Sequence, residues 1–472
     1  MLGISDSVAR GFDDVLRGSI WLILSGLVVN LSGLVFWLLS SRFAGASGVG
    51  YAASAVSISG LVSTLLNLGL PYAMLREIPV RGSKAFSSGL LIAILLGLLG
   101  SLIVIYTPLS SLYTGFSSYA LLAVVMTILS MVSIVSLNTL IAMDMVWEYF
   151  LVVLASNIAR IAFGVPLILL GYGGLGAAFG MLLASIVAST ASLALSVRRL
   201  GLAAPGSGDL AEILRIGASN YPISLSPALV SGGVVAAGIL TRDPEAAGVT
   251  YISLMISSAV GLIPSSVASV SIPAMMRGAS PELSRLGASL SASLVLPIAV
   301  GVGISSRSVL GILGSDFSAR WEILTILSLV SIPYAAIANS MSRMNWERSL
   351  ARLATIGVAS LAVLATLSPI LAGLAGVEGI AIAYLASSIA PLPLIRGVDI
   401  HGIIKMMAIQ AILTIGLSQP PRESLIDAAL GAIGSIASII AAHISKVSRI
   451  ELLGRAIAVA INIVRNRHTN RE

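Results

Sequence analysis

The chain has 472 residues, of which 57% are hydrophobic and 10% are charged, and it carries a formal net charge of +7 with no cysteine. An average soluble domain has about 25% charged residues, so this composition excludes a water-soluble globular protein. The lack of cysteine excludes a disulfide framework, an iron–sulfur cluster and a thiolate metal site. The three histidines, His401, His443 and His468, are too scattered for a ligand set, and we expect neither a metal nor a cofactor.

Apolar blocks long enough to cross a hydrocarbon core of about 30 Å recur along the whole sequence. They predict an all-α integral membrane protein with about fourteen transmembrane helices. The first block is longer than the core of a signal peptide, so we interpret it as a retained span. In chain order the predicted spans are 18–40, 48–70, 85–106, 118–142, 149–171, 175–197, 211–240, 246–270, 284–306, 321–342, 349–372, 377–395, 402–418 and 424–444.

Basic residues are distributed unevenly between the loops on the two sides of these spans. One side carries most of the 27 lysines and arginines, and the other carries only Arg42, Arg242, Arg307, Arg320 and Arg422. The positive-inside rule then predicts a multi-pass protein of the cytoplasmic membrane with both termini in the cytoplasm. Nucleic-acid binding would need a basic folded face, which this chain lacks. Residues 446–472 alternate basic and apolar residues and predict a helix on the anionic cytoplasmic leaflet, with a frayed tail as the alternative.

Shifting the chain by about 200 residues aligns its first six predicted spans with the next six. This predicts a six-helix bundle at 1–200, a second at 201–400, two extra helices at 401–445 and a basic amphipathic tail at 446–472. Six is an even number, so a pseudo-twofold axis along the membrane normal is expected, with alternating access through the cleft between the bundles. The matches are Arg42 with Arg242, 48–51 with 248–251, 73–76 with 274–277, 147–148 with 346–347 and 175–178 with 378–381.

The order of six, six and two spans resembles that of polysaccharide-biosynthesis flippases, as do Arg76 and Glu77 after the second span and the glycine-rich segments 171–180 and 373–383. These flippases belong to the multidrug/oligosaccharidyl-lipid/polysaccharide exporter superfamily, with multidrug and toxin extrusion proteins and lipid II flippases. The resemblance covers nearly the whole chain. It implies that a monomer, surrounded by membrane lipids, moves a lipid-linked glycan, an anionic phospho- or pyrophospho-lipid, from the inner to the outer leaflet.

Arg160 is the one basic residue predicted near the middle of a span, where a charge is costly and usually faces a water-filled cavity or a partner. Asn157 precedes it by three residues and shares its helix face. Asn30 in the first span and Asn67 at the end of the second lie in similar stripes of polar and small residues. Such stripes either line a cavity or are ordinary helix-packing faces in which the asparagines bond to backbone.

Two further sets of candidates lie near span ends. Arg42 and Arg242 are expected at the outer mouth, where they either bind phosphate through bidentate contacts or extend toward the interface. Pro222 and Pro227 interrupt the hydrogen bonds of the seventh predicted span and predict a bend that serves gating or is an ordinary kink. Pro264, Pro273, Pro297 and Pro333 predict further breaks in the second half.

The alternatives to a flippase are a cation-coupled antiporter, a membrane glycosyltransferase and a structural or scaffold membrane protein, the last of which requires a closed cleft between the bundles. No lysine follows a glycine, so a phosphate-binding Walker loop is absent and ATP is not the direct motor. A cation-coupled drug or toxin antiporter needs a carboxylate deep in the membrane, and no predicted span has one near its middle. A membrane glycosyltransferase needs acidic metal ligands and a sizeable extramembrane domain, so we expect a transporter and not an enzyme.

Overall fold

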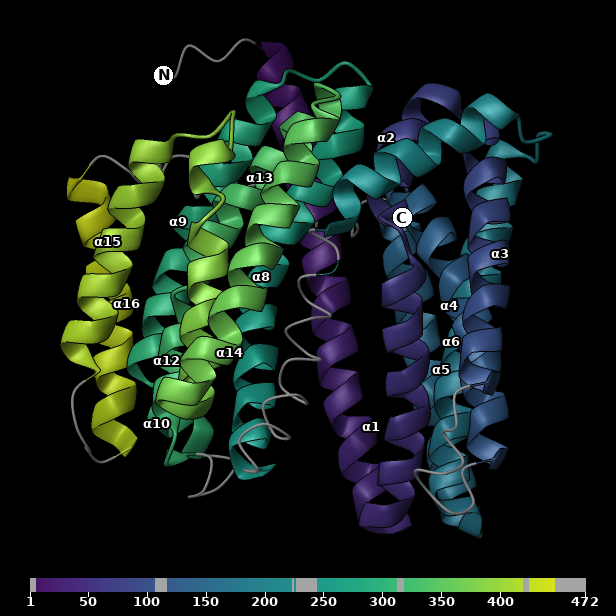
Figure 1. The fold of residues 1–472 in the computed structure, drawn as a ribbon, viewed down its shortest axis with the longest axis horizontal. Helices are drawn as coiled ribbons and strands as arrows, with labels where there is room; N and C mark the ends of the chain where they lie inside the picture. The colour runs from purple at the N-terminus through teal and green to yellow at the C-terminus, as the bar shows by residue number, and fades with distance from the viewer. Residues whose placement is uncertain are drawn as a thin grey trace, which may run out of the picture. The chain divides into compact units, whose positions relative to one another are not determined.

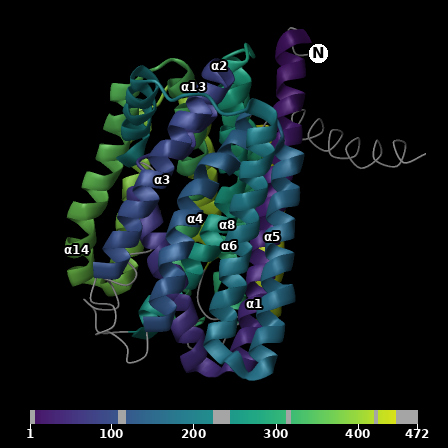
Figure 2. The same cartoon turned by 90° about the vertical axis from the view of Figure 1, so that its right-hand side faces the viewer.

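The computed structural model describes residues 6–106, 117–222, 225, 244–311, 318–418 and 424–445. These residues are almost entirely helical, and none of them forms a strand, as Figures 1 and 2 show. A helix satisfies its own backbone hydrogen bonds, which is a condition for crossing lipid. Ten helices of the described part are long and apolar enough to cross a membrane, or up to eleven if one bent pair counts as a span. The all-α membrane fold is thus confirmed, whereas the count of fourteen and the pseudo-twofold axis stay predictions.

The chain divides into two compact units, Trp21–Leu225 and Ser226–Glu472 together with Met1–Ile20. We name them the N-unit and the C-unit. The predicted bundle boundaries at 200 and 400 stay predictions. The N-unit contains most of α1 (Asp6–Leu66), α2 (Leu70–Arg81), α3 (Ser83–Tyr106), α4 (Ser117–Ala142), α5 (Val146–Leu167), the π-helix η2 (Ile168–Tyr172), α6 (Gly173–Leu200) and a helix over 207–222.

Helix α1 carries the first two predicted spans in one run of 61 residues. A straight helix of that length would measure about 92 Å, three times the thickness of a hydrocarbon core. Figure 1 shows α1 as two antiparallel legs. Phe36 on the first leg and Ala52 and Ala55 on the second share one buried core cluster. The two legs therefore pack together as two passes.

Helices α5 and α6 form a hairpin joined by η2. The chain reverses at Gly171 and Gly173, whose φ angles of 94° and 50° favour glycine. The two helices then approach closely at a pair of glycines, because a Cβ atom on Gly180 would lie only 2.7 Å from Gly164 Cα. Helix α4 packs on α6, and α3 packs on α4. Close contact through small residues is typical of membrane helices.

The C-unit is built around α13 (Ser331–Trp346), which packs against four other helices. A break at Ala375 and Gly376 divides α14 between the two spans predicted at 349–372 and 377–395. The other elements of the unit are α8 (Pro244–Met276), α9 (Glu282–Ile304), α10 (Ser306–Gly311), α12 (Trp321–Ser328), α14 (Leu350–Ile389), η3 (Leu392–Leu394), α15 (Ile400–Leu417) and α16 (Ser424–Ile444).

Several sequence-based expectations about breaks were wrong. Helix α8 continues through Pro264 and Pro273, and α9 continues through Pro297. A proline removes one backbone hydrogen bond, and packing in a membrane bundle compensates for that loss. By contrast, the predicted span 321–342 lies within one candidate span, Trp321–Trp346, and this span is interrupted between α12 and α13 close to Pro333, where a break was expected.

One turn occurs twice in the chain, once in each half. Asp144 and Arg348 both have a positive φ, 65° and 55°. In each turn the next residue donates its N–H to a carbonyl five residues earlier: Met145 to Leu140 at 2.9 Å, and Ser349 to Met344 at 2.9 Å. Helices α5 and α14 begin directly afterwards. The turn precedes Trp147 in the first half but follows Trp346 in the second, so it does not align under the match of 147–148 with 346–347, and the internal repeat stays a prediction.

Candidate functional site

The candidate site surrounds Arg160 in the second half of α5. The residue is 7% exposed. Its Nη2 donates a hydrogen bond to Ser32 Oγ on α1 at 2.8 Å, and its Nη1 lies 4.0 Å from Met181 Sδ on α6. Its Cζ lies 5.5 Å from the centroid of the Phe36 ring on α1. Three helices of the N-unit therefore surround this one cation.

The hydroxyl proton of Ser32 has acceptors on its own helix and on α5. Asn157 Oδ1 lies 2.9 Å from Ser32 Oγ, and Val28 O also accepts from it. Asn157 is 6% exposed and donates from Nδ2 to Val153 O at 2.7 Å. With the hydroxyl proton engaged in this way, the lone pairs of Ser32 Oγ are free to accept from Arg160. Asn157 thus acts on Arg160 through Ser32.

Most of the hydrogen-bonding capacity of Arg160 is unused. A guanidinium group has five N–H donors. Nη2 reaches the oxygen of Ser32, the sulfur of Met181 is a weak acceptor, and Nε is buried without a hydrogen-bond partner. In the described part of the chain no carboxylate forms an ion pair with it. A buried cation in this state attracts an anionic ligand or water.

Glycines make room around the guanidinium. A Cβ atom at Gly33 would lie 3.8 Å from Arg160 Nη2, and one at Gly164 would lie 2.7 Å from Phe36 Cε2. A larger residue at Gly164 would displace the Phe36 ring, whereas a Cβ atom at Gly33 would only contact the guanidinium. Two of the stripes found in the sequence, one on α1 and one on α5, therefore meet at this point.

The other predicted asparagines do not join this cluster. Asn30 is exposed and donates from Nδ2 to Gly26 O at 2.9 Å, within its own helix. Asn67 is buried, and its Oδ1 accepts from Gly69 N at 2.8 Å, where the chain bends by 53° between α1 and α2. Asn67 therefore shapes a turn.

The remaining candidates lie at the limits of the described residues. Arg42 falls within α1, but its side chain lies outside the described part. Arg242 and Pro227 also lie outside it, whereas Pro222 is the last residue of the helix over 207–222. Their roles stay predictions.

Ser32, Phe36 and Met181 were missed by sequence reasoning. Serine is common in these spans, and nothing in the sequence distinguishes Ser32 from a serine that bonds only to its own helix. Ser25, for example, donates to Trp21 O at 2.8 Å. Ser32 lies beside Gly33 in the predicted stripe, which is the one signal that pointed to this region.

A second charged cluster ties α2 to the helix over 207–222. Arg76 and Glu77 are both buried and form an ion pair. Arg81 Nε donates to Glu77 Oε2 at 2.8 Å, and Arg81 Nη1 donates to Asp209 Oδ1 at 2.7 Å. The predicted spans do not include residues 71–84, so neither α2 nor this network was predicted. Because each charge has a partner, we interpret the cluster as structural.

The C-terminal half of the helix over 207–222 contacts the backbone of the bend between α1 and α2. A Cβ atom on Gly69 would collide with Gly217 O, and Tyr221 Oη donates to Leu65 O, one of the last carbonyls of α1. Residues 207–222 are thereby held along the bend between α1 and α2.

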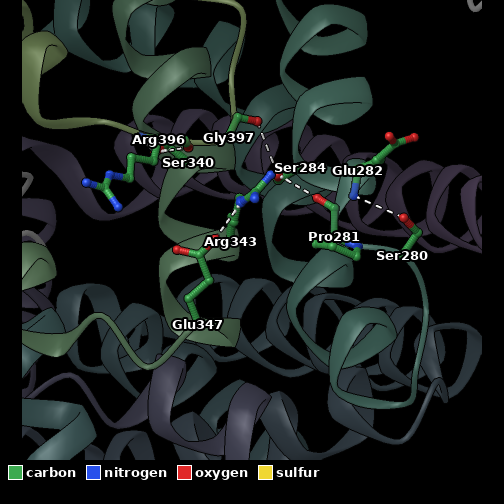
Figure 3. A network of polar contacts seen from close by, with 9 residues as sticks. All are labelled: Ser280, Pro281, Glu282, Ser284, Ser340, Arg343, Glu347, Arg396 and Gly397. Carbon is green, nitrogen blue, oxygen red and sulfur yellow. Dashed lines mark hydrogen bonds and ion pairs between the residues drawn. The ribbon is translucent and has the colours of Figure 1, made fainter.

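Figure 3 shows a polar network in the C-unit. Arg343 Nε in α13 donates to Oε1 of Glu347, the residue that follows the helix, at 2.6 Å. Ser340 Oγ donates to Arg396 O at 2.7 Å and accepts from Arg396 N at 2.9 Å, and Ser284 Oγ lies 3.3 Å from Gly397 O. These bonds fasten the segment after η3 to α13 and α9, which is a structural role.

One buried carboxylate was not singled out in the sequence. Asp427 in the first turn of α16 is 7% exposed, and Ser308 Oγ donates to its Oδ2 at 3.5 Å. In the part of the chain that the structure describes, no group of three or more acidic or histidine side chains is suited to hold a metal ion.

The fold has solved counterparts. A eukaryotic MATE transporter, AtDTX14, has a TM-score of 0.67 at 17% identity, and the likeness covers 92% of this chain and 100% of that one. A MOP superfamily transporter from Pyrococcus furiosus, described as having a binding pocket of reversed polarity, has a TM-score of 0.64 at 16% identity, with coverage of 87% and 97%. A multidrug resistance MATE family transporter in an outward-facing conformation has a TM-score of 0.62 at 16% identity, with the same coverage. At these identities the likeness shows the fold.

The multi-pass helical fold and the sequence together define a membrane transporter of the multidrug/oligosaccharidyl-lipid/polysaccharide exporter superfamily. The model of the Polysaccharide biosynthesis protein family matches residues 15–279, which is more than half of the chain. The chain belongs to this family. No curated protein matches the sequence at a significant level.

Proposed function

We propose that the chain is a flippase that moves an anionic lipid-linked oligosaccharide from the inner to the outer leaflet by alternating access. The observation that carries this proposal is the buried guanidinium of Arg160 with its unpaired Nε. A phosphate or pyrophosphate oxygen suits such a group, because guanidinium binds phosphate through paired N–H donors. Membership of a family described by polysaccharide biosynthesis supports a glycan-bearing substrate.

The surroundings of Arg160 suit a transient ligand. Ser32 holds one edge of the guanidinium, so a phosphate would meet donors that are already oriented. The Phe36 ring lies near Cζ and interacts favourably with a cation without satisfying its N–H donors. An inside-negative potential favours export of an anion by about 2.3 kcal/mol per charge per 100 mV. Export of such a lipid therefore requires no coupling ion.

A cation-coupled drug antiporter is the second candidate, because solved structures with this fold include multidrug transporters. Such coupling needs an accessible carboxylate within the membrane. Glu77 is paired with two arginines, and Asp427 lies in the first turn of α16, where the helix dipole stabilises its charge. The positive charge of Arg160 favours an anionic substrate over a cationic one.

The proposal is tested with the purified full-length chain in proteoliposomes that carry a fluorescent polyprenyl-pyrophosphate oligosaccharide. Lipid that reaches the opposite leaflet is measured with a membrane-impermeant quencher. We expect Arg160→Ala to abolish transfer and Arg160→Lys to retain part of it, with Arg199→Ala, an exposed arginine on α6, as the matched control. Size-exclusion profiles and protein yield check folding. Normal transfer by both Arg160 variants would reject the role of Arg160, and no transfer by the wild type would reject the flippase.

A further inference from the structure

Tyr334 is the only exposed residue of α13. The other residues of that helix are buried or half-buried, because α13 packs against α8, α9, α14 and α15. Tyr334 is 36% exposed. A phenol on a helix that its neighbours enclose faces an opening in the bundle.

The opening has a polar wall on α8. Tyr334 Cε1 would lie 3.5 Å from a Cβ atom at Gly261, and Ser265 lies one turn further along α8, near the Tyr334 hydroxyl. Ser258 precedes Gly261 by one turn and is exposed. These three residues of α8 share one face, since they follow helical spacing.

This face of α8 does not suit lipid. Among the described side chains of α8 no large apolar residue is exposed, whereas the outer helix α16 exposes a stripe of isoleucines. The exposed isoleucines of that stripe include Ile433, Ile436, Ile440 and Ile444. Lipid-facing surfaces are apolar, so the serine-lined face of α8 is expected to meet water.

A second tyrosine lies at the same opening. Tyr384 on α14 is half-buried, and its phenol lies near that of Tyr334. Helices α8, α13 and α14 contact one another in pairs. The sequence has no charged residue from 246 to 276, from 331 to 342 or from 353 to 377. Tyr384 lies in 379–395, which also has no charged residue, and Glu378 just before that segment pairs with Arg320 at 3.5 Å. The opening thus combines aromatic rings and hydroxyls, and the charge nearest to Tyr384 along α14 is that of the paired Glu378.

We propose that Tyr334, Tyr384, Ser258 and Ser265 form a binding site for a neutral sugar ring of the transported molecule. This inference rests on the proposed flippase function and assigns the C-unit a task different from that of Arg160. Tyrosine offers an apolar face and a hydroxyl, which match the C–H face and the hydroxyl groups of a sugar. The serines add donors and acceptors. The lack of charge suits a neutral ligand better than a phosphate.

The test compares two lipids in proteoliposomes with the full-length protein: a polyprenyl pyrophosphate that carries an oligosaccharide and the same pyrophosphate without sugar. We expect Tyr334→Ala to weaken binding of the glycan-bearing lipid by about tenfold and to leave binding of the sugar-free lipid unchanged. Tyr334→Phe keeps the aromatic ring, so we expect it to weaken binding of the glycan-bearing lipid less than Tyr334→Ala does. Arg160→Ala is expected to weaken both lipids equally.

Tyr172→Ala is the matched control, because Tyr172 in η2 is 59% exposed and belongs to the other unit. Equal binding of the glycan-bearing lipid by wild type and Tyr334→Ala, with both variants monodisperse, would overturn the sugar site. Equal weakening for both lipids would also overturn it, because it indicates a structural role. A wild type that binds neither lipid would instead reject the flippase. If the protein bound a cationic dye and Tyr334→Ala abolished that binding, the ligand of this site would be an aromatic cation and not a sugar.

Discussion

Ser32 Oγ lies 2.9 Å from Asn157 Oδ1, and this contact joins the first leg of α1 to the helix that carries Arg160. The same hydroxyl oxygen accepts from Arg160 Nη2 at 2.8 Å. A serine that bonded only to its own helix would leave the guanidinium without an oxygen partner. Ser32 is therefore a positioning residue for the cation.

Ser32→Ala tests this role. It removes the oxygen partner of Arg160, and leaving a buried donor unsatisfied costs about 1–3 kcal/mol. We expect a lower thermal stability and weaker binding of polyprenyl pyrophosphate, with Ser32→Thr retaining both. Ser25→Ala on the same helix is the control, because the Ser25 hydroxyl bonds only to Trp21 O. Equal stability and binding for the two alanine variants would show that Ser32 does not position Arg160.

Gly180→Ala is expected to separate α5 from α6. The new methyl group would lie 2.7 Å from Gly164 Cα and 3.0 Å from Arg160 O, both backbone atoms that do not move aside easily. Overpacking of this kind costs about 1–3 kcal/mol. Thermal unfolding in detergent, followed by tryptophan fluorescence, measures the loss.

Gly60→Ala on α1 provides the comparison for that measurement, because a Cβ atom there would meet nothing within 4 Å. Alanine favours a helix over glycine by about 0.5–1 kcal/mol, so this variant is expected to match or exceed the wild type. A Gly180→Ala protein as stable as Gly60→Ala would mean that the glycine pair is not tightly packed.

Asp209→Asn is expected to loosen the helix over 207–222 from α2. The substitution removes the charge that pairs with Arg81 at 2.7 Å, while Glu77 keeps its own bond to Arg81. The pair is about a third exposed on the Arg81 side, so its contribution is at most about 1 kcal/mol and weakens with salt. Limited proteolysis between residues 201 and 206 is expected to speed up, more at low than at high ionic strength. Glu282→Gln on α9 serves as the charge-matched control, because Glu282 is exposed and forms no ion pair with any described residue, and an identical rate for the two variants would contradict the prediction.

The predicted orientation can be mapped without background labelling, because the chain has no cysteine. We expect a membrane-impermeant maleimide to label Ser418→Cys in intact cells and to label Ser207→Cys only after permeabilisation. The basis is the excess of basic residues on the side that includes residue 207. The opposite labelling pattern would invert the topology and place both termini outside.

The sequence predicted the charged residue of the site but not the residues that contact its guanidinium. Arg160 and Asn157 stood out because charge and amide are rare in an apolar helix, and the structure places them on one buried face. Ser32 and Phe36 acquire their meaning only when α1 packs on α5, which no local pattern encodes. Arg76 and Glu77 suggested a polar loop, but mutual neutralisation allows α2 to bury them. The breaks predicted at Pro264 and Pro273 do not occur, because α8 continues through both residues.

The α5–α6 hairpin also bears on how this protein enters the membrane during synthesis. A lone α5 would expose an arginine to lipid at a cost of about 2.5–3.5 kcal/mol at the helix centre. The reversal at Gly171 and Gly173 lets α6 follow within five residues of η2, so both helices can insert as one piece. Met181 and the Gly164–Gly180 contact then shield one side of Arg160, and α1, already synthesised, covers the other. The order of synthesis thus supplies partners for the charge before it has to meet lipid.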